Sequence, residues 1–111
     1  AERGEEVVVT SDLVIAETVY VLSSRHYGLS HQRIRELLEP VISLRGFRLP
    51  RKSLYPRIWE LYCQRNIGFA DAYNAAFMEA RSLNEVYSYD TDFDRVEGIS
   101  RVEPEGQLPM P

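Results

Sequence analysis

The sequence predicts an α/β domain with a mostly parallel sheet covered by helices. Three observations favour this class. Short β-branched segments bracket longer segments of helical periodicity, the 111 residues contain no internal repeat, and 44% of them are hydrophobic while 27% are charged. We therefore expect one domain over residues 1–104 and a loose tail over 105–111.

The first predicted elements are a strand and a helix. The β-branched segment at 6–10 indicates a short buried strand. Ser11 or Asp12 should then cap a helix over 12–26, because both side chains accept hydrogen bonds from a first helical turn. Gly28 is in the stop position of that helix.

A second helix should begin at Ser30, and an extended segment should follow at 46–50. Apolar residues recur in this helix with the spacing i, i+3, i+4, i+7, i+8, namely Ile34, Leu37, Leu38, Val41 and Ile42. Pro40 lies inside the pattern and should kink or split the helix.

The second half of the chain predicts two more helices and two strands. Ser53 should cap a third helix that runs to about residue 65, with Pro56 tolerated in its first turn. Four alanines mark a fourth helix over 70–82 that can pack closely. Strands are expected at 85–89 and 99–103.

Composition excludes some classes of function. The formal net charge of −4 does not indicate a nucleic-acid-binding protein, although a local basic groove would be enough to bind nucleic acid. The single cysteine, Cys63, excludes a disulfide framework within the chain and fits a reducing compartment. We expect it to be a small core residue. No apolar run approaches the length of a membrane span.

Glu17 is the most unusual residue of the first helix. Apolar residues surround it, so the helix should be buried, and a buried carboxylate is costly unless something pairs with it or binds it. A salt bridge to an arginine of a neighbouring helix and a metal ion are both adequate partners.

Two further acids belong to the same predicted sheet edge. Asp71 lies in the first turn of the fourth helix, and Asp90 follows the strand at 85–89. With Glu17 they would offer a hard cation such as Mg²⁺ or Mn²⁺ an all-oxygen site. Each has a simpler interpretation, since Asp71 suits a helix N-terminus and Asp90 and Asp92 suit turns.

Other polar residues give weaker signals. His26 and His31 are expected to be solvated or capping. Basic residues cluster in one region, which a solvated face explains better than a phosphate-binding ridge: Arg45, Arg48, Arg51, Lys52 and Arg57. No catalytic triad, zinc spacing or glycine-rich phosphate loop is present.

Three segments together resemble the PIN domain, and within it the VapC-type toxins: SDLVIAETVYVL, GFADAYNAAFMEAR and VYSYDTDFDRV. The resemblance covers residues 6–103. It implies a three-layer α/β/α fold and a divalent-metal-dependent endoribonuclease, usually cytoplasmic, often dimeric and often neutralised by a cognate antitoxin. By match of motif, Glu17, Asp71 and Asp90 resemble the catalytic acids that hold Mg²⁺ or Mn²⁺, and Asp92 resembles an accessory metal-binding acid.

The chain departs from the family pattern at its beginning. PIN domains start with a central strand that ends in the first metal-binding Asp, and no such element precedes residue 6. The resemblance therefore implies the C-terminal portion of a PIN domain, without its first strand–helix unit and without one ligand. A catalytically inactive PIN-like binding or regulatory module is the alternative function, and a DNA-directed nuclease of the wider superfamily is a third.

Overall fold

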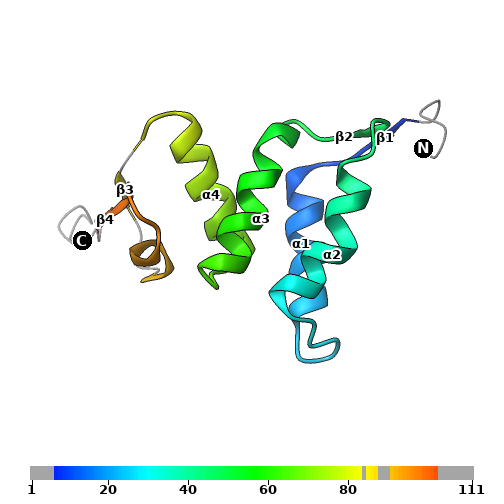
Figure 1. Ribbon diagram of the computed structural model, residues 1–111, viewed down its shortest axis with the longest axis horizontal. Coiled ribbons are helices and arrows are strands. Elements are labelled where there is room, and N and C mark those ends of the chain that lie inside the picture. Colours follow the sequence, from blue (N-terminus) through cyan, green and yellow to red (C-terminus); the bar gives the residue numbers. More distant parts are fainter. Residues whose placement is uncertain (1–6, 84, 88–90, 103–111) are drawn as a thin grey trace, which may run out of the picture.

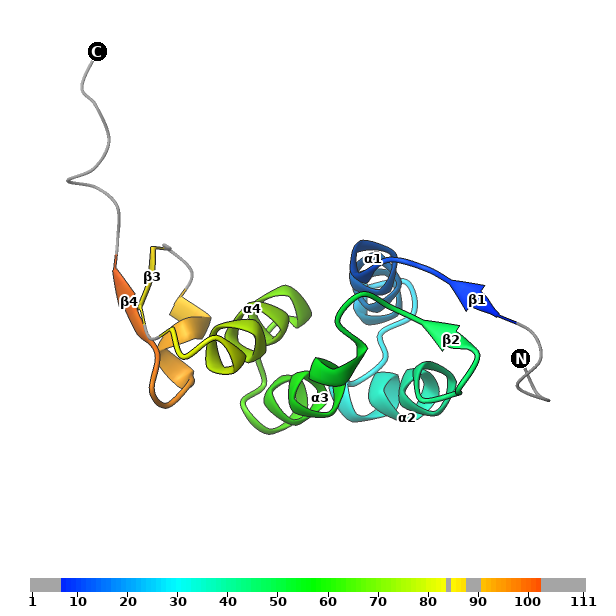
Figure 2. The same cartoon turned by 90° about the horizontal axis from the view of Figure 1, so that it is seen from above.

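The computed structural model describes residues 7–83, 85–87 and 91–102, and it is elongated, with extents of 55 × 32 × 31 Å. Four α-helices lie side by side in the described residues, with a pair of parallel strands at each end (Figure 1). The predicted α/β class with parallel strands is confirmed. The described strands form two separate two-stranded sheets, however, and the view from above shows them at opposite ends of the helical layer (Figure 2).

The first sheet joins β1 (Val8–Val9) to β2 (Phe47–Arg48), with Val8 opposite Phe47 and Val9 opposite Arg48. The predicted extended segment at 46–50 is thus confirmed. The prediction that the first strand is buried was wrong, because Val8 is 42% exposed and Val9 74% exposed. β1 has only β2 as a neighbour among the described strands, so one of its edges stays open.

Helix α1 (Asp12–Ser23) begins as its sequence predicts and ends earlier than residue 26. The Ser11 hydroxyl accepts a hydrogen bond from the Val14 N–H at 3.2 Å, and Gly28 has a φ of +61° that favours glycine. The expectation that this helix is buried was wrong. Only Ile15 and Val19 are buried, whereas one broad apolar face is open to solvent: Leu13, Val14, Tyr20 and Val21.

Helix α2 (His31–Ile42) begins after Ser30, whose hydroxyl accepts from the Arg33 N–H at 3.1 Å. It is not split at Pro40. This proline lies in the last turn, so its missing N–H removes a single helical bond, and the Ser43 N–H still donates to the Glu39 carbonyl.

Helices α3 (Tyr55–Gln64) and α4 (Phe69–Ala80) pack against each other. The predicted cap at Ser53 was wrong, because a 3₁₀ turn over Lys52–Leu54 precedes α3 and no side chain caps that helix. Pro56 lies in the first turn of α3, as expected.

The core lies between these helices and is aromatic at its centre. Trp59 is fully buried, and its ring lies 6.2 Å from that of Tyr55, 6.0 Å from that of Tyr62 and 5.5 Å from that of Phe69. The three fully buried alanines of α4 let its backbone approach α3, which agrees with the close packing that the sequence predicts: Ala72, Ala75 and Ala76, at 0%, 0% and 2% exposure.

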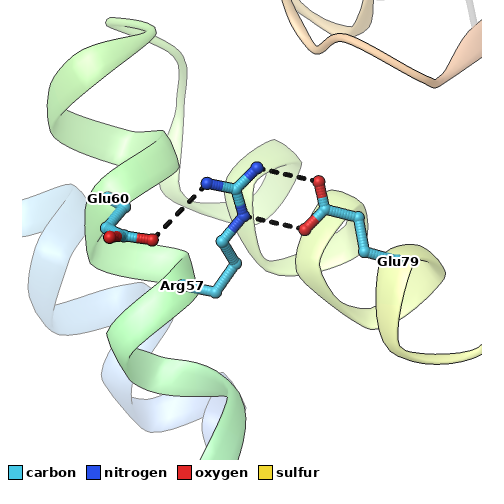
Figure 3. Close-up of polar contacts among 3 residues, drawn as sticks. All are labelled: Arg57, Glu60 and Glu79. Atoms are coloured by element: carbon cyan, nitrogen blue, oxygen red, sulfur yellow. Dashed lines mark hydrogen bonds and ion pairs between the residues drawn. The ribbon is translucent and has the colours of Figure 1, made fainter.

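An ion-pair network fixes the outer side of this helix pair. The Arg57 guanidinium on α3 donates two hydrogen bonds to Glu79 on α4, at 2.8 and 3.0 Å, and a third to Glu60 at 3.4 Å (Figure 3). Such a bidentate pair is geometrically specific. Arg57 therefore has a structural role, as does Lys52, whose ammonium donates to the Leu44 and Phe47 carbonyls.

The second sheet pairs β3 (Glu85–Tyr87) with β4 (Ser100–Val102), and a 3₁₀ segment over Thr91–Arg95 lies between them in the chain. Both strands lie within the predicted ranges. The end of the strand predicted at 85–89 lies outside the described residues. So do Ser88, Asp90 and the predicted tail at 105–111. No described helix is both long and apolar enough to cross a membrane.

Alkaline pH should destabilise the fold through Tyr62. Burial raises the pKa of this phenol from 10.0 to about 12. Between these pH values the unfolded chain loses a proton that the folded chain keeps. The contribution of Tyr62 to stability is therefore fully present below pH 10 and falls as the pH rises toward 12. Urea midpoints measured across this window should decline, and Tyr62→Phe should make the decline shallower. An equally steep decline in the variant would remove Tyr62 as a cause.

Candidate metal centre at the start of α4

The start of α4 is tied to the 3₁₀ segment that precedes β4. The Gly68 N–H, at the N-cap of α4, donates to Oδ2 of Asp92 at 3.2 Å, and the Arg95 guanidinium donates to the Asn66 carbonyl at 2.9 Å. These two bonds place Asp92 beside the first turn of a helix that is 24 residues away in the chain.

Asp71 lies on the same helical turn, close to Gly68. A Cβ atom at position 68 would lie 3.8 Å from Oδ2 of Asp71. Asp71 and Asp92 therefore both lie near Gly68, where the helix dipole favours negative charge. The position fits both the simple interpretation of Asp71, a first-turn acid, and the interpretation as a metal ligand.

Glu17 lies on α1, and it lines a pocket of about 550 Å³ together with the start of α4, residues 68–70. It is exposed, so the prediction of a buried carboxylate was wrong. Within the described residues it also forms no ion pair, which removes the alternative of a salt bridge to a neighbouring arginine. An exposed carboxylate keeps its hydration and needs no partner. It remains available to a ligand in the pocket.

Three of the four predicted ligands lie within the described residues. Glu17 and Asp71 belong to facing helices, Asp92 adjoins Asp71 through Gly68, and Asp90 lies outside the described residues. The described residues contain no group of three or more His, Cys, Asp or Glu side chains close enough to hold a metal ion. The donor set consists only of carboxylate oxygens, which suits Mg²⁺ or Mn²⁺ and does not suit zinc or copper.

Asp12 has a structural role that the sequence did not reveal. Its Oδ1 accepts from the Tyr55 hydroxyl at 2.7 Å, and its Oδ2 accepts from the Tyr73 hydroxyl at 2.8 Å. Burial and this carboxylate raise the pKa of both phenols. Asp12 thereby joins the first turn of α1 to both α3 and α4. Its partners lie 43 and 61 residues away, so no local pattern could have identified them.

His31 also differs from its prediction. Its ring stacks on Tyr62 with a centroid distance of 4.0 Å, and its Nε2 lies 3.0 Å from the Ile67 carbonyl, to which it donates. The imidazole therefore joins the start of α2 to the loop before α4, and it forms part of the lining of the same pocket as Glu17. It is partly buried, and Ser30 rather than His31 is the N-cap of α2.

Comparison with protein families matches residues 1–99 to the PIN domain. The chain belongs to the PIN domain family. Neither a search of curated proteins nor a search of solved structures gave a significant match. PIN domains are typically nucleases that use divalent metal ions, and the matched span contains Glu17, Asp71, Asp90 and Asp92.

In this PIN domain, we expect Asp12→Ala to lower stability by about 2 kcal/mol, because a buried Tyr55 hydroxyl would lose its acceptor. Chemical denaturation measures this loss. Tyr73→Phe should cost less, since Asp12 keeps its hydrogen bond from the Tyr55 hydroxyl and Tyr73 is only partly buried. If Asp12→Ala were as stable as the unmodified chain, the link between the three helices would carry no net stability.

Proposed function

We propose that this PIN domain is a divalent-metal-dependent endoribonuclease of the VapC toxin type. The observation that carries the proposal is the position of two acids at one helix end. Asp71 and Asp92 both adjoin Gly68, and Gly68 lines the pocket to which Glu17 contributes from α1. The family match supports nuclease chemistry for such a set of carboxylates.

Glu17, Asp71 and Asp90 would hold Mg²⁺ or Mn²⁺, with Asp92 as an accessory acid. When bound, such an ion supplies an activated water and neutralises charge that develops on a phosphate. The chain's own residues orient the carboxylates. The Gly68 N–H fixes one oxygen of Asp92, and the first turn of α4 carries Asp71 beside it.

A cleavage assay with controlled metal content tests this function. The intact natural protein, including any residues that precede Ala1, should cut RNA in Mg²⁺ or Mn²⁺. Chelation with EDTA should stop cleavage, and Mn²⁺ added back should restore it. RNA that stays intact under all of these conditions, while the protein is folded, would favour the inactive binding or regulatory module instead.

The VapC type carries two further proposals about partners. A small cognate antitoxin would neutralise the enzyme in the cytoplasm, and the protein would form a homodimer. Co-expression with the gene product encoded next to it tests the first, since an antitoxin should co-purify and suppress cleavage.

Self-association of the 111-residue chain is expected because of its open apolar surface. Leu13, Tyr20 and Val21 of α1 are 69%, 76% and 49% exposed, and the edge of β1 is unpaired among the described strands. Light scattering should show species larger than a monomer. Leu13→Glu combined with Val21→Glu should shift the chain toward monomer. An unmodified chain that is monomeric at about 100 μM, a concentration at which weak pairing is detectable, would contradict the expectation.

A further inference from the structure

Two arginines contact one aromatic ring of α4, that of Phe77. The guanidinium carbons of Arg51 and Arg81 each lie 4.8 Å from the centre of the Phe77 ring. Arg81 follows the C-terminus of α4, whereas Arg51 comes from the segment before α3, so the ring brings together cations 30 positions apart in the chain. Stacking against an aromatic face leaves the N–H edges of a guanidinium free to bind an anion.

The charges of this arginine pair are not neutralised by a direct ion pair. Other arginines contact carboxylates, among them Arg35 with Glu39 and Arg57 with Glu79. Within the described residues Arg51 and Arg81 have no such contact, and both are exposed. In the part of the chain that the structure describes, Arg51 donates only to the Tyr73 hydroxyl, at 3.3 Å, which in turn donates to Asp12. Two guanidinium groups supported by one ring form a preorganised anion-binding arrangement.

One arginine of the pair, Arg51, lines a hollow that adjoins the pocket of Glu17. This pocket of about 310 Å³ is lined by Arg51 and the acid Asp12, with Tyr73 and Asn74 beside them. It shares Ala16, Phe69 and Ala70 with the larger pocket that Glu17 lines. A chain that occupied both pockets would therefore extend between α1 and α4, from Arg51 to the carboxylates.

We propose that Arg51 and Arg81, held by Phe77, bind backbone phosphates of the RNA strand and position it for cleavage. This inference rests on the proposed ribonuclease function. The arginines are positioning residues, since Arg51 lines the smaller pocket and Glu17 lines the larger one. Planar guanidinium groups suit phosphate because they can donate two parallel hydrogen bonds.

The affinity for a single-stranded RNA oligonucleotide, measured by fluorescence anisotropy in EDTA, tests the arginine pair without any need for cleavage. The double variant Arg51→Gln with Arg81→Gln should bind at least about tenfold more weakly. The slope of log K against log salt should become shallower by about 1.4, the value for two phosphate contacts on a single strand. In the cleavage assay KM should rise and kcat should change little.

Matched variants test whether the effect on RNA binding comes from these two arginines or from the loss of net charge alone. Arg25→Gln with Arg45→Gln removes the same charge from two exposed arginines that do not contact the Phe77 ring, and it should keep the original salt slope. Phe77→Leu keeps both charges and should weaken binding by removing their support. Thermal melting should show that each variant is folded.

The outcomes separate this proposal from the nuclease assignment. RNA binding that depends on Arg51 and Arg81 without cleavage would support the arginine pair and overturn the nuclease. Cleavage by the unmodified protein with unchanged affinity and slope in the double variant would overturn the arginine pair alone. Binding of an acidic peptide that depends on the pair, with RNA binding unaffected, would assign the pair to a protein partner and overturn the proposal.

Discussion

Asp71→Asn should reduce metal-dependent RNA cleavage by at least about 100-fold in the intact protein. Asparagine has nearly the size of aspartate and still suits a helix N-terminus, but it lacks the charge that a hard cation requires. The first turn of α4 should therefore survive while metal binding is lost. Initial rates on a fluorescent RNA at saturating Mn²⁺ measure the effect, and Glu17→Gln should lower the rate in the same direction.

Asp94→Asn is the matched control for this prediction. Asp94 belongs to the same 3₁₀ segment as Asp92, but it is exposed and pairs with Arg101 at 3.0 Å. Asparagine keeps an oxygen that can accept from the Arg101 guanidinium, so this variant should cleave RNA at nearly the original rate. Undiminished cleavage by both Asp71→Asn and Glu17→Gln would place the catalytic site elsewhere.

Trp59→Ala should lower the free energy of unfolding by about 3–5 kcal/mol, which is a large part of the stability of a domain this size. Trp59 is fully buried among the rings of Tyr55, Tyr62 and Phe69, so its removal would leave a cavity between α3 and α4. Phe69 is the first residue of α4, and this cavity would loosen the helix that carries Asp71. Urea denaturation followed by circular dichroism measures the change.

Trp59→Phe should be much milder. The indole Nε1 is buried and has no hydrogen-bond partner among the residues that the structure describes, so phenylalanine removes an uncompensated polar group along with part of the ring. The two effects oppose each other. A loss below about 1 kcal/mol in Trp59→Ala would mean that the core relaxes around the cavity and that Trp59 does not organise the helices.

Local chemistry explains which parts of the fold could be predicted. Ser11 and Ser30 cap helices through bonds to N–H groups three residues away, and Gly28 supplies a positive φ, so each signal lies within a few residues. The division into two sheets depends on contacts between distant segments, such as Val8 with Phe47. No periodicity within either strand encodes that pairing.

The same difference between local signals and distant contacts applies to the candidate site. The sequence predicted Asp71 at a helix start and, by match of motif, Asp92 as an accessory acid, and the structure places both near Gly68. The sequence was wrong about Glu17, because an apolar helix predicts burial only when other elements cover all of its faces, and one face of α1 is open. The proposed role of Arg51 and the structural role of Asp12 both depend on contacts with α4, and only the packing of the helices reveals these contacts.

The central claim is that carboxylates at the start of α4 hold the divalent ion that cleavage requires. Crystals of the intact protein grown with Mn²⁺ test this most directly, through the anomalous difference map. We expect one strong peak coordinated by Glu17, Asp71 and Asp90, and its absence in Asp71→Asn crystals. A map of the unmodified protein with no peak within coordination distance of Asp71, from crystals that diffract well in saturating Mn²⁺, would contradict the claim.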